Sequence, residues 1–477
     1  MKLKNLIINL VFIFIIFISF FIFLKGLDNL KNIPLYSYFL FFISFTVTLA
    51  SLYFLKISNF DKKINFLTII FFSYITLFFI NSFLILNDFY NPAVLKEKEK
   101  RIERAKKSEI QFDERTKLQV IQDLKEKNKT AYSVMLPSLF IQSSKKNDLV
   151  PLSGISNSLT VYGNETGEYL IYLSDRYGFN NDDYIYDHDM IDYLIIGDSF
   201  AHGANVAKGE DVASILRKKG YTAVTIGMGA SGPLIELASL IEYGVQFKPK
   251  KILWFYFSND STDLVRELQN PMLKKYITHE NFKQNLLSKQ KKIDEVLKTL
   301  HESKIREYQK NNEQRFFKTS YNPIKLFSKN NIRKSFTLYQ IRALLNIDKG
   351  AFIKENRITS ETEENFKKIF YKACKIADKN NSQFFFVNLS SFKTLSKGKT
   401  FSSNFVEYFI NNFFVKRINF GDFLLLQDDF KSFFPFQMAG HYTKEGYEEL
   451  AEIILDNTRN KDLNNCNYNK INNIESL

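Results

Sequence analysis

The sequence predicts an α/β protein in which three N-terminal membrane helices precede a soluble domain built around a parallel β-sheet. Three apolar runs without a charged residue stand near the amino terminus, and each is close to the roughly 20 residues that cross a bilayer as a helix. Farther along, short apolar strands alternate with amphipathic helices. Crossovers of that length require parallel strands with right-handed connections.

The composition of the chain limits its partners. The 477 residues carry a formal net charge of +14, but the basic residues are spread along the chain and form no compact stripe interleaved with aromatic residues. We therefore expect no nucleic-acid binding. The two cysteines, Cys374 and Cys466, stand in unrelated contexts. We expect neither a disulfide framework nor a CxxC metal site, and the redox compartment stays open.

The three apolar runs cover residues 6–24, 33–55 and 64–86. The first exceeds the apolar part of a signal peptide, and no small-residue cleavage site follows it, so we predict a membrane span there. An odd number of spans places the amino terminus and the part after residue 86 on opposite sides. Lysines at the amino terminus and between the second and third runs favour a cytoplasmic location for both. The segment 95–107 is more basic still and would then lie outside, so charge alone does not decide the topology.

The chain divides into six predicted parts. They are a membrane anchor (1–90), a charged and solvated juxtamembrane stalk (91–108), a strand-rich lead-in (109–190), an α/β domain in two pieces (191–263 and 346–457), a helical insertion between these pieces (264–345), and a disordered tail (458–477).

The α/β domain is predicted from a regular order of elements. Apolar strands are expected at 193–197, 222–226, 251–257 and 383–389, and helices at 210–220, 234–244, 364–380 and 443–455. The first strand is apolar at every position, which is typical of the interior of a parallel sheet. Gly220 ends the first helix, and Thr443 is a plausible N-cap of the last one.

Four places with polar or glycine residues fall at strand ends of this sheet, where ligands bind in α/β proteins. Ser199 follows the first strand, the turn 227-GMGASG-232 the second, and Asn259 the third, while His441 precedes the last helix. Serine attack on a carbonyl needs a base beside the hydroxyl and donors that face the developing oxyanion. His441 is the candidate base; the Ser199 N–H, an N–H of the turn and the Asn259 amide are candidate donors.

The blocks 197-GDSF-200, the glycine turn, 258-SND-260 and 440-GHYTKEGY-447 resemble the four ordered blocks of the SGNH (GDSL-type) hydrolases, a family of esterases, lipases and O-acetyl-transferring relatives. The resemblance covers residues 190–265 and 363–456. It implies a flavodoxin-like three-layer α/β/α domain. It also implies Ser199 as nucleophile, Gly229 (or the adjacent Ala230) and Asn259 as oxyanion donors, and His441 as general base.

The chain departs from the family pattern at two positions. A glycine commonly stands two residues before the asparagine, where this chain has Phe257. The last block usually carries an aspartate three residues before the histidine, and here that position is Met438. Either another carboxylate orients the imidazole, with Asp422, Asp428 and Asp429 as candidates, or a backbone carbonyl does so in a Ser–His dyad.

Other interpretations of these residues remain. Ser199 and Asn259 are also residue types that cap helices and close turns. His202 is a rival base, but it lies on the same turn as the serine. The cluster 187-DHD-189 resembles metal ligands without a partner set, so we expect a solvated loop. The aromatic residues of 433-FFPFQ-437 fit a core or a pocket wall.

The sequence thus predicts a membrane-anchored, multi-pass serine esterase without a metal or organic cofactor. By resemblance, its C-terminal domain lies outside the cytoplasm and its substrate is an acylated carbohydrate or a lipid-linked glycan. Three alternatives stay open: an O-acyltransferase with the same serine and histidine, a non-catalytic glycan-binding or scaffold protein, and a phospholipase with the insertion as a lid.

Overall fold

The computed structural model describes residues 2–28, 35–56, 59–86, 92–143, 149–316, 334–339, 341, 359–459 and 465–467. The chain forms two compact units, one made of residues 1–99 and 312–355 and the other of residues 100–311 and 356–477. The predicted insertion 264–345 is therefore divided between the two units.

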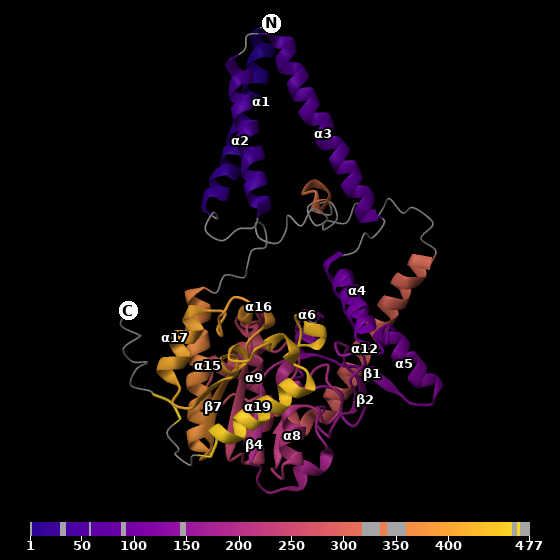
Figure 1. Ribbon diagram of the computed structural model, residues 1–477, viewed down its shortest axis with the longest axis vertical. Coiled ribbons are helices and arrows are strands. Elements are labelled where there is room, and N and C mark those ends of the chain that lie inside the picture. Colours follow the sequence, from indigo (N-terminus) through magenta and orange to yellow (C-terminus); the bar gives the residue numbers. More distant parts are fainter. Residues whose placement is uncertain are drawn as a thin grey trace. The chain divides into compact units, whose positions relative to one another are not determined.

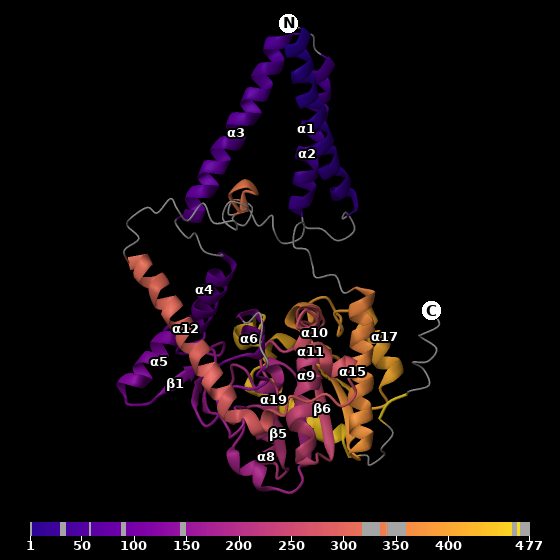
Figure 2. The ribbon, with the colours of Figure 1, turned by 180° about the vertical axis from the view of Figure 1, so that it is seen from behind.

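The first unit contains three long apolar helices, α1 (Lys2–Asp28), α2 (Leu35–Lys56) and α3 (Phe60–Leu86). Helices α1 and α2 lie side by side (Figures 1 and 2). The helices occupy the positions of the three predicted spans. Within the described residues, one helix, Phe60–Ile85, is long and apolar enough to cross a membrane. Three spans therefore stay a prediction.

A short stretch of the predicted insertion contacts α3 within the first unit. The side-chain Nδ2 of Asn81 donates to the carbonyl oxygens of Lys334 at 3.0 Å and Ser335 at 3.3 Å. Its Oδ1 accepts from the backbone N–H of Ile341 at 3.2 Å. One asparagine amide thus satisfies backbone groups at both ends of this stretch, which binds it to the apolar helix.

The second unit contains a five-stranded sheet in which all neighbouring strands are parallel. Its strands are β4 (Tyr193–Ile196), β5 (Ala223–Thr225), β6 (Lys251–Tyr256), β7 (Gln383–Asn388) and β8 (Arg417–Asn419), in the spatial order β5-β4-β6-β7-β8. This is the doubly wound, flavodoxin-like order, and the chain reverses direction across the sheet at β4. The prediction of an α/β domain with a parallel sheet is confirmed. Strand β8 was not predicted, because only one of its three residues is buried.

Helices cover both faces of this sheet and make three layers (Figure 1). Leu194 and Ile196 of β4 face the core under one set of helices, and Tyr193 and Ile195 face the other core. The first set comprises α9 (Pro233–Ser239), α15 (Ser360–Lys379) and α17 (Asn404–Phe413); the second comprises α8 (Val212–Lys218), α18 (Phe420–Leu425) and α19 (Lys444–Asn457). Alternation along strands that are buried on both faces produces the continuous apolar runs seen in the sequence.

The part of the predicted insertion that belongs to the second unit packs into the domain core. It includes the second half of α10 (Asp260–Glu267), α11 (Pro271–Thr278) and most of α12 (Gln290–Phe316). Leu273 of α11 and Ile293 of α12 are fully buried in the same core as α9. Short helical turns complete the unit: η1 (Asp183–Asp187), η2 (Leu240–Gly244), η3 (Val245–Phe247), η4 (Leu286–Lys289), α16 (Phe392–Leu395), η7 (Phe430–Phe433) and η8 (Pro435–Gln437).

The lead-in forms a small separate sheet with helices beside it. Strands β1 (Ala131–Ser133) and β2 (Leu159–Val161) are parallel, and β2 and β3 (Ile171–Leu173) are antiparallel. Helices α5 (Lys117–Glu126) and α6 (Pro137–Ser143) belong to the same region. The predicted strand-rich segment 109–190 therefore contains short strands and two helices.

The segment that was predicted to be a solvated stalk, 91–108, forms helix α4 (Pro92–Lys107). Arg101 and Ala105 of this helix are buried within the second unit. The prediction of a fully solvated stalk is wrong here, because backbone carbonyl groups satisfy the buried guanidinium and an apolar face is not needed.

The structure corrects the prediction about the cysteines and, at residues 465–467, the prediction of a disordered tail; residues 460–464 and 468–477 of that tail lie outside the described residues. Cys374 of α15 and Cys466 form a disulfide, although they stand 92 residues apart. The neighbouring Asn465 side chain donates to Asp378 Oδ1 at 2.7 Å and to Ser382 O at 2.9 Å, and it accepts from the N–H of Phe384 at 2.8 Å. Residues 465–467 of the predicted disordered tail are thus attached to the edge of the sheet. Spacing along the chain gave no indication of this pairing, since the fold brings the two cysteines together.

Candidate functional site

Ser199 lies at the carboxyl end of β4, on the first residue of the short helix α7 (Ser199–His202). Asp198 is the N-cap of this helix, and its carboxylate accepts from the N–H of Phe200 at 3.0 Å. Gly197 has φ +151°, and a Cβ there would collide with Phe255 of the neighbouring strand β6. Only glycine fits this turn. The turn places Ser199 directly after β4, at the point where the sheet order reverses.

His441 faces Ser199 from a loop that precedes α19. The Nε2 atom of His441 lies 2.7 Å from Ser199 Oγ, although 242 residues separate the two in the chain. Thr443, as predicted, caps α19, and its hydroxyl accepts from the N–H of Gly446. The structure thus brings together the predicted nucleophile and the predicted base at hydrogen-bonding distance.

Glu165, which the sequence did not indicate, completes the arrangement. Its Oε2 lies 3.1 Å from His441 Nδ1 and accepts from the His441 backbone N–H at 2.8 Å. A carboxylate at Nδ1 keeps the proton on that nitrogen, so Nε2 is the acceptor for the serine proton. The three atoms Oγ, Nε2 and Nδ1 therefore form a continuous chain that ends on a carboxylate.

Glu165 corrects the predictions about the third member. Neither a backbone carbonyl nor one of the three aspartates contacts the imidazole in the described residues. Asp422 accepts from Asn419 at 2.7 Å, and Asp429 accepts from the N–H of Lys431 at 3.1 Å as the N-cap of η7. Met438, at the position of the usual acid, is half-buried in the same loop. The carboxylate comes from another part of the chain because the lead-in packs against the histidine loop.

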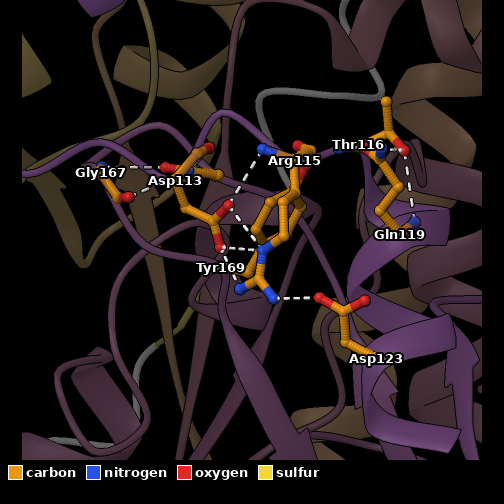
Figure 3. Close-up of polar contacts among 8 residues, drawn as sticks. Asp113, Arg115, Thr116, Gln119, Asp123, Gly167 and Tyr169 are labelled. Carbon is orange, nitrogen blue, oxygen red and sulfur yellow. Dashed lines mark hydrogen bonds and ion pairs between the residues drawn. The ribbon is translucent and has the colours of Figure 1, made fainter. Parts of the chain in front are cut away.

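The turn that carries Glu165 is fixed by hydrogen bonds to the segment before α5 (Figure 3). The N–H of Asp113 donates to Gly167 O at 2.7 Å, and the Tyr169 hydroxyl donates to Arg115 O at 2.8 Å. Arg115 in turn bridges Asp113 at 2.6 Å and Asp123 at 2.5 Å. These contacts add to the antiparallel pairing of β2 and β3, which continues as the N–H of Tyr162 donates to Leu170 O and the N–H of Leu170 donates to Gly163 O, both at 2.9 Å. Glu165 therefore stands at the tip of a hairpin that the segment before α5 holds from the side.

Asn205, six residues after the serine, contacts both His441 and the turn that carries Glu165. Its side-chain Nδ2 lies 3.1 Å from His441 Nδ1, and its backbone carbonyl oxygen accepts from the Thr166 hydroxyl at 3.1 Å. Nδ1 can accept from Asn205 only in the tautomer that places the proton on Nε2, whereas Glu165 favours the proton on Nδ1. The carboxylate of Glu165 decides this competition, because an ionised acceptor binds the imidazole N–H more strongly than a neutral amide does.

The charges at the site set the pKa values of the pair. Burial alone would raise the pKa of Glu165, but the charge of His441, its two hydrogen bonds and the charge of Arg101 lower it to about 2. Burial lowers the pKa of His441, but Glu165 and, to a smaller extent, Asp198 outweigh it, and the net shift is upward. Glu165 is therefore ionised at neutral pH, and it stabilises a protonated His441.

The predicted oxyanion donors lie around the serine turn. The N–H of Met228, next to Gly229, donates to Gly197 O at 3.3 Å and places the glycine turn beside the serine turn. A side chain at Gly229 would collide with the Tyr162 hydroxyl. Within the described residues the backbone N–H groups of Ser199 and Gly229 have no hydrogen-bond partner. Both are therefore available to a substrate oxygen.

Asn259 follows β6, as predicted, and its side-chain amide interacts with acidic side chains. Its Nδ2 donates to Asp263 Oδ2 at 3.0 Å, and its Oδ1 is buried without a partner in the described residues. A hydrogen bond from Asn259 also opposes the rise that burial causes in the pKa of Asp198. The amide therefore lies beside the residue that precedes the serine.

Two carboxyl groups are buried behind this amide, Glu236 on α9 and Asp260 at the start of α10. Each has one oxygen without a partner in the described residues, while Trp254 Nε1 donates to Glu236 at 2.5 Å. Burial raises the pKa of both well above the ordinary carboxyl range, and repulsion from nearby carboxylates adds to the rise, mainly from Asp198 for Glu236 and from Glu236 for Asp260. Burial therefore favours the protonated form of both groups in the folded domain.

His202 and the acidic loop do not belong to the arrangement. The His202 Nε2 lies 2.9 Å from the Tyr172 hydroxyl in a buried aromatic pocket, and burial lowers its pKa to about 3. In the cluster 187–189, Asp187 pairs with Arg176 at 3.2 Å. Within the described residues no group of three or more His, Cys, Asp or Glu side chains is arranged to hold a metal ion.

Sequence reasoning missed Glu165, Asn205 and Arg101. The stretch 162-YGNETGEY-169 showed only Asn164 and Gly167, which mark a turn, and a lone glutamate in a turn is ordinarily a solvated residue. Asn205 stands six residues after the serine, in a left-handed conformation with φ +64° that asparagine tolerates. None of these signals separates a functional residue from a turn former.

Comparisons of the chain with protein-family models, with curated proteins and with solved structures find no match.

Proposed function

We propose that this chain is a membrane-anchored serine esterase of the SGNH type. The Ser199–His441–Glu165 arrangement carries the proposal, with 2.7 Å between Oγ and Nε2 and 3.1 Å between Nδ1 and Oε2. Residues from three distant parts of the chain converge in the order that activates a serine, at the switch point of a doubly wound sheet. A cap or a turn former would need only one of these contacts.

The reaction is an acyl transfer through a covalent intermediate. His441 Nε2 takes the proton of Ser199 as Oγ forms a bond to the ester carbonyl carbon. The carbonyl oxygen becomes an oxyanion, which the N–H groups of Ser199 and Gly229 and the amide of Asn259 stabilise once Asn259 turns from Asp263. His441 then returns the proton to the leaving alkoxide as the ester C–O bond breaks. Water, activated by the same histidine, releases the acid and restores the serine.

The substrate class rests on the family resemblance: an ester of an acylated carbohydrate or of a lipid-linked glycan. Two observations support a location at a membrane and outside the cytoplasm. Helix Phe60–Ile85 is long and apolar enough to cross a bilayer. The disulfide Cys374–Cys466 is typical of oxidising compartments. We propose three spans with the amino terminus in the cytoplasm and the catalytic domain outside.

An O-acyltransferase remains the second candidate, because the acyl-enzyme can be attacked by a sugar hydroxyl in place of water. The non-catalytic scaffold was credible mainly because Met438 replaces the usual acid, and Glu165 removes that reason. A phospholipase with a lid loses support as well, since Leu273 and Ile293 of the predicted lid are core residues.

The esterase proposal is tested by labelling the full-length protein in detergent with a fluorophosphonate. We expect the wild type to be labelled and to hydrolyse a nitrophenyl acetate, and Ser199→Ala to do neither while keeping its thermal unfolding temperature. Ser396→Ala removes an exposed hydroxyl on α16's carboxyl end and is the matched control. An unlabelled wild type, or a Ser199→Ala variant that turns over normally, overturns the esterase.

Product analysis separates esterase from transferase. The wild type is incubated with the acyl donor, with and without an acceptor sugar. Free acid in equal yield under both conditions supports the hydrolase; an acylated sugar formed at the expense of free acid supports the transferase.

A further inference from the structure

The loop that presents His441, residues 435–441, holds an unusual backbone conformation. Phe436 and Gln437 both have positive φ angles, +55° and +52°, in the left-handed region that residues with a Cβ rarely adopt. Two such residues in succession persist only where surrounding contacts hold them.

Two arginines of helix α4 bind the carbonyl groups of the loop. Arg104 Nη1 donates to Phe436 O at 2.7 Å and to Gln437 O at 3.0 Å, the two left-handed residues. Arg101 Nη2 donates to Ala439 O at 2.5 Å, two residues before the histidine. The guanidinium group suits this task because its donors project in a rigid fork.

Arg101 joins the loop to the glutamate as well. Its Nη1 donates to the carbonyl oxygen of Glu165 at 3.3 Å. A Cβ on Gly440 would lie 2.7 Å from Glu165 Oε2 and 3.0 Å from Arg101 Nη2. Glycine at position 440 thus lets the loop pass between the carboxylate and the guanidinium, and Arg101 contacts both sides of the His441–Glu165 pair.

We infer that Arg101 and Arg104 are positioning residues: they hold the histidine loop and the glutamate turn at the distance that lets Glu165 contact His441. The rate of the serine reaction then depends on the packing of helix α4 against the domain. This inference rests on the proposed function. Arg101 is buried and contacts both partners, whereas Arg104 is exposed and contacts the loop alone. Arg101 is therefore the principal residue of the two.

Arg101 also acts through its charge. The charged groups that act on His441 are Glu165, Asp198 and Arg101; the two carboxylates raise the pKa of His441, and Arg101 lowers it. The loss of Arg101 should therefore raise the pKa of His441 further. A purely structural contact would leave the pH dependence unchanged, so the two roles are separable.

The test compares Arg101→Met and Arg101→Lys with the wild type, all full-length in detergent. For Arg101→Met we expect the rate of fluorophosphonate labelling to fall on the order of 10- to 100-fold, as a misplaced reacting group does. We also expect the acidic limb of its pH profile to move to higher pH. Arg101→Lys keeps the charge but not the fork, so its rate should fall while its acidic limb stays near that of the wild type.

Hydrogen exchange of the backbone measures the loop directly and does not require activity. Peptides that cover residues 435–441 should exchange faster in Arg101→Met and in Arg104→Ala than in the wild type. Lys106→Ala is the matched control: Lys106 is exposed on the same helix and pairs only at 3.6 Å with Glu114. It should match the wild type in labelling, pH profile and exchange.

The inference is overturned if Arg101→Met and Arg104→Ala both exchange like the wild type in the histidine loop. It is equally overturned if Arg101→Met is labelled within about twofold of the wild-type rate with the same acidic limb. A wild type that no fluorophosphonate labels would refute the esterase instead, and exchange of the loop would then still decide whether the arginines hold it.

Discussion

The serine side and the acid side of the site are built in different ways. Ser199 stands at the end of a fully buried strand between two parallel neighbours, at a turn that only glycine can form. Glu165 stands at the tip of the hairpin between β2 and β3, and hydrogen bonds from the segment around Asp113 hold this tip from the side. The core of the main sheet fixes the first, whereas a short hairpin outside that sheet and polar contacts with a distant segment fix the second.

This difference predicts which parts of the site tolerate change. The serine side depends on the core of the sheet, so it should survive any surface substitution. The acid side depends on a few contacts, so single substitutions there should move the imidazole without unfolding the domain. Substitutions at Glu165 should therefore cost the most activity, and substitutions away from the imidazole the least.

Neutralising Glu165 should have the largest effect on the acid side. Glu165→Gln should lower kcat about 10⁴-fold, the loss seen when a triad acid becomes an amide, because the amide no longer enforces the tautomer or stabilises the imidazolium. Steady-state hydrolysis of a nitrophenyl ester measures it. Glu168→Gln, an exposed residue of the same turn, is the control. Equal activity of Glu165→Gln and the control would remove Glu165 from the mechanism.

Removing the Asn259 amide should have a smaller effect. Asn259→Ala should lower kcat on the order of 10²–10³-fold with little change in KM, because an oxyanion donor acts mainly in the transition state. Thr262→Ala, in the first turn of the same helix, should keep wild-type kinetics. If Asn259→Ala stays within about twofold of the wild type, the residue only shapes the turn.

The pH profile should show the coupling of His441 to Glu165. The base must be neutral, and the pKa of His441 is raised above its ordinary 6.5, so kcat/KM should rise with pH through a value above 6.5. Glu165, with a pKa of about 2, stays ionised throughout and adds no limb. In the residual activity of Glu165→Gln the limb should move to lower pH, since the main group that raises the pKa of His441 is gone. A limb that does not move contradicts the pairing.

The smallest effects are expected at the three aspartates that the sequence offered as third members. Asp422→Asn, Asp428→Asn and Asp429→Asn should each stay within about twofold of wild-type kcat, because Glu165 already occupies Nδ1. A loss of about 10⁴-fold in one of these variants would identify that aspartate as the third member of the triad and would contradict the observed geometry.

The sequence predicted the sheet and the serine–histidine pair because both follow from local patterns. Fully apolar strands between amphipathic helices define a parallel sheet, and a serine after such a strand has a predictable place at its carboxyl end. His441 was predictable for the same reason, because it precedes a helix with a clear N-cap. In each case the informative residues are close together in the chain.

The remaining features depend on contacts between segments that sequence patterns do not connect. Glu165 meets His441 across 276 residues, and Arg101 meets Ala439 across 338. Arg101 in particular sits in a lysine-rich helix in which a buried cation and a solvated one have the same sequence signature. The disulfide between Cys374 and Cys466 was missed because spacing carries no information about such pairs.

The two buried carboxyls with raised pKa values, Glu236 and Asp260, carry a consequence for handling the protein. Their pKa values are raised in the fold above the ordinary 4.5 and 3.8, so the folded state binds more protons than the unfolded one. Their contribution to stability is therefore lost as the pH rises above that range, and it returns as the pH falls back. Catalysis has the opposite requirement, since His441 must lose its proton. In mildly acidic buffer the protein should therefore be more stable against unfolding but less active. Raising the pH should increase turnover and lower the free energy of unfolding.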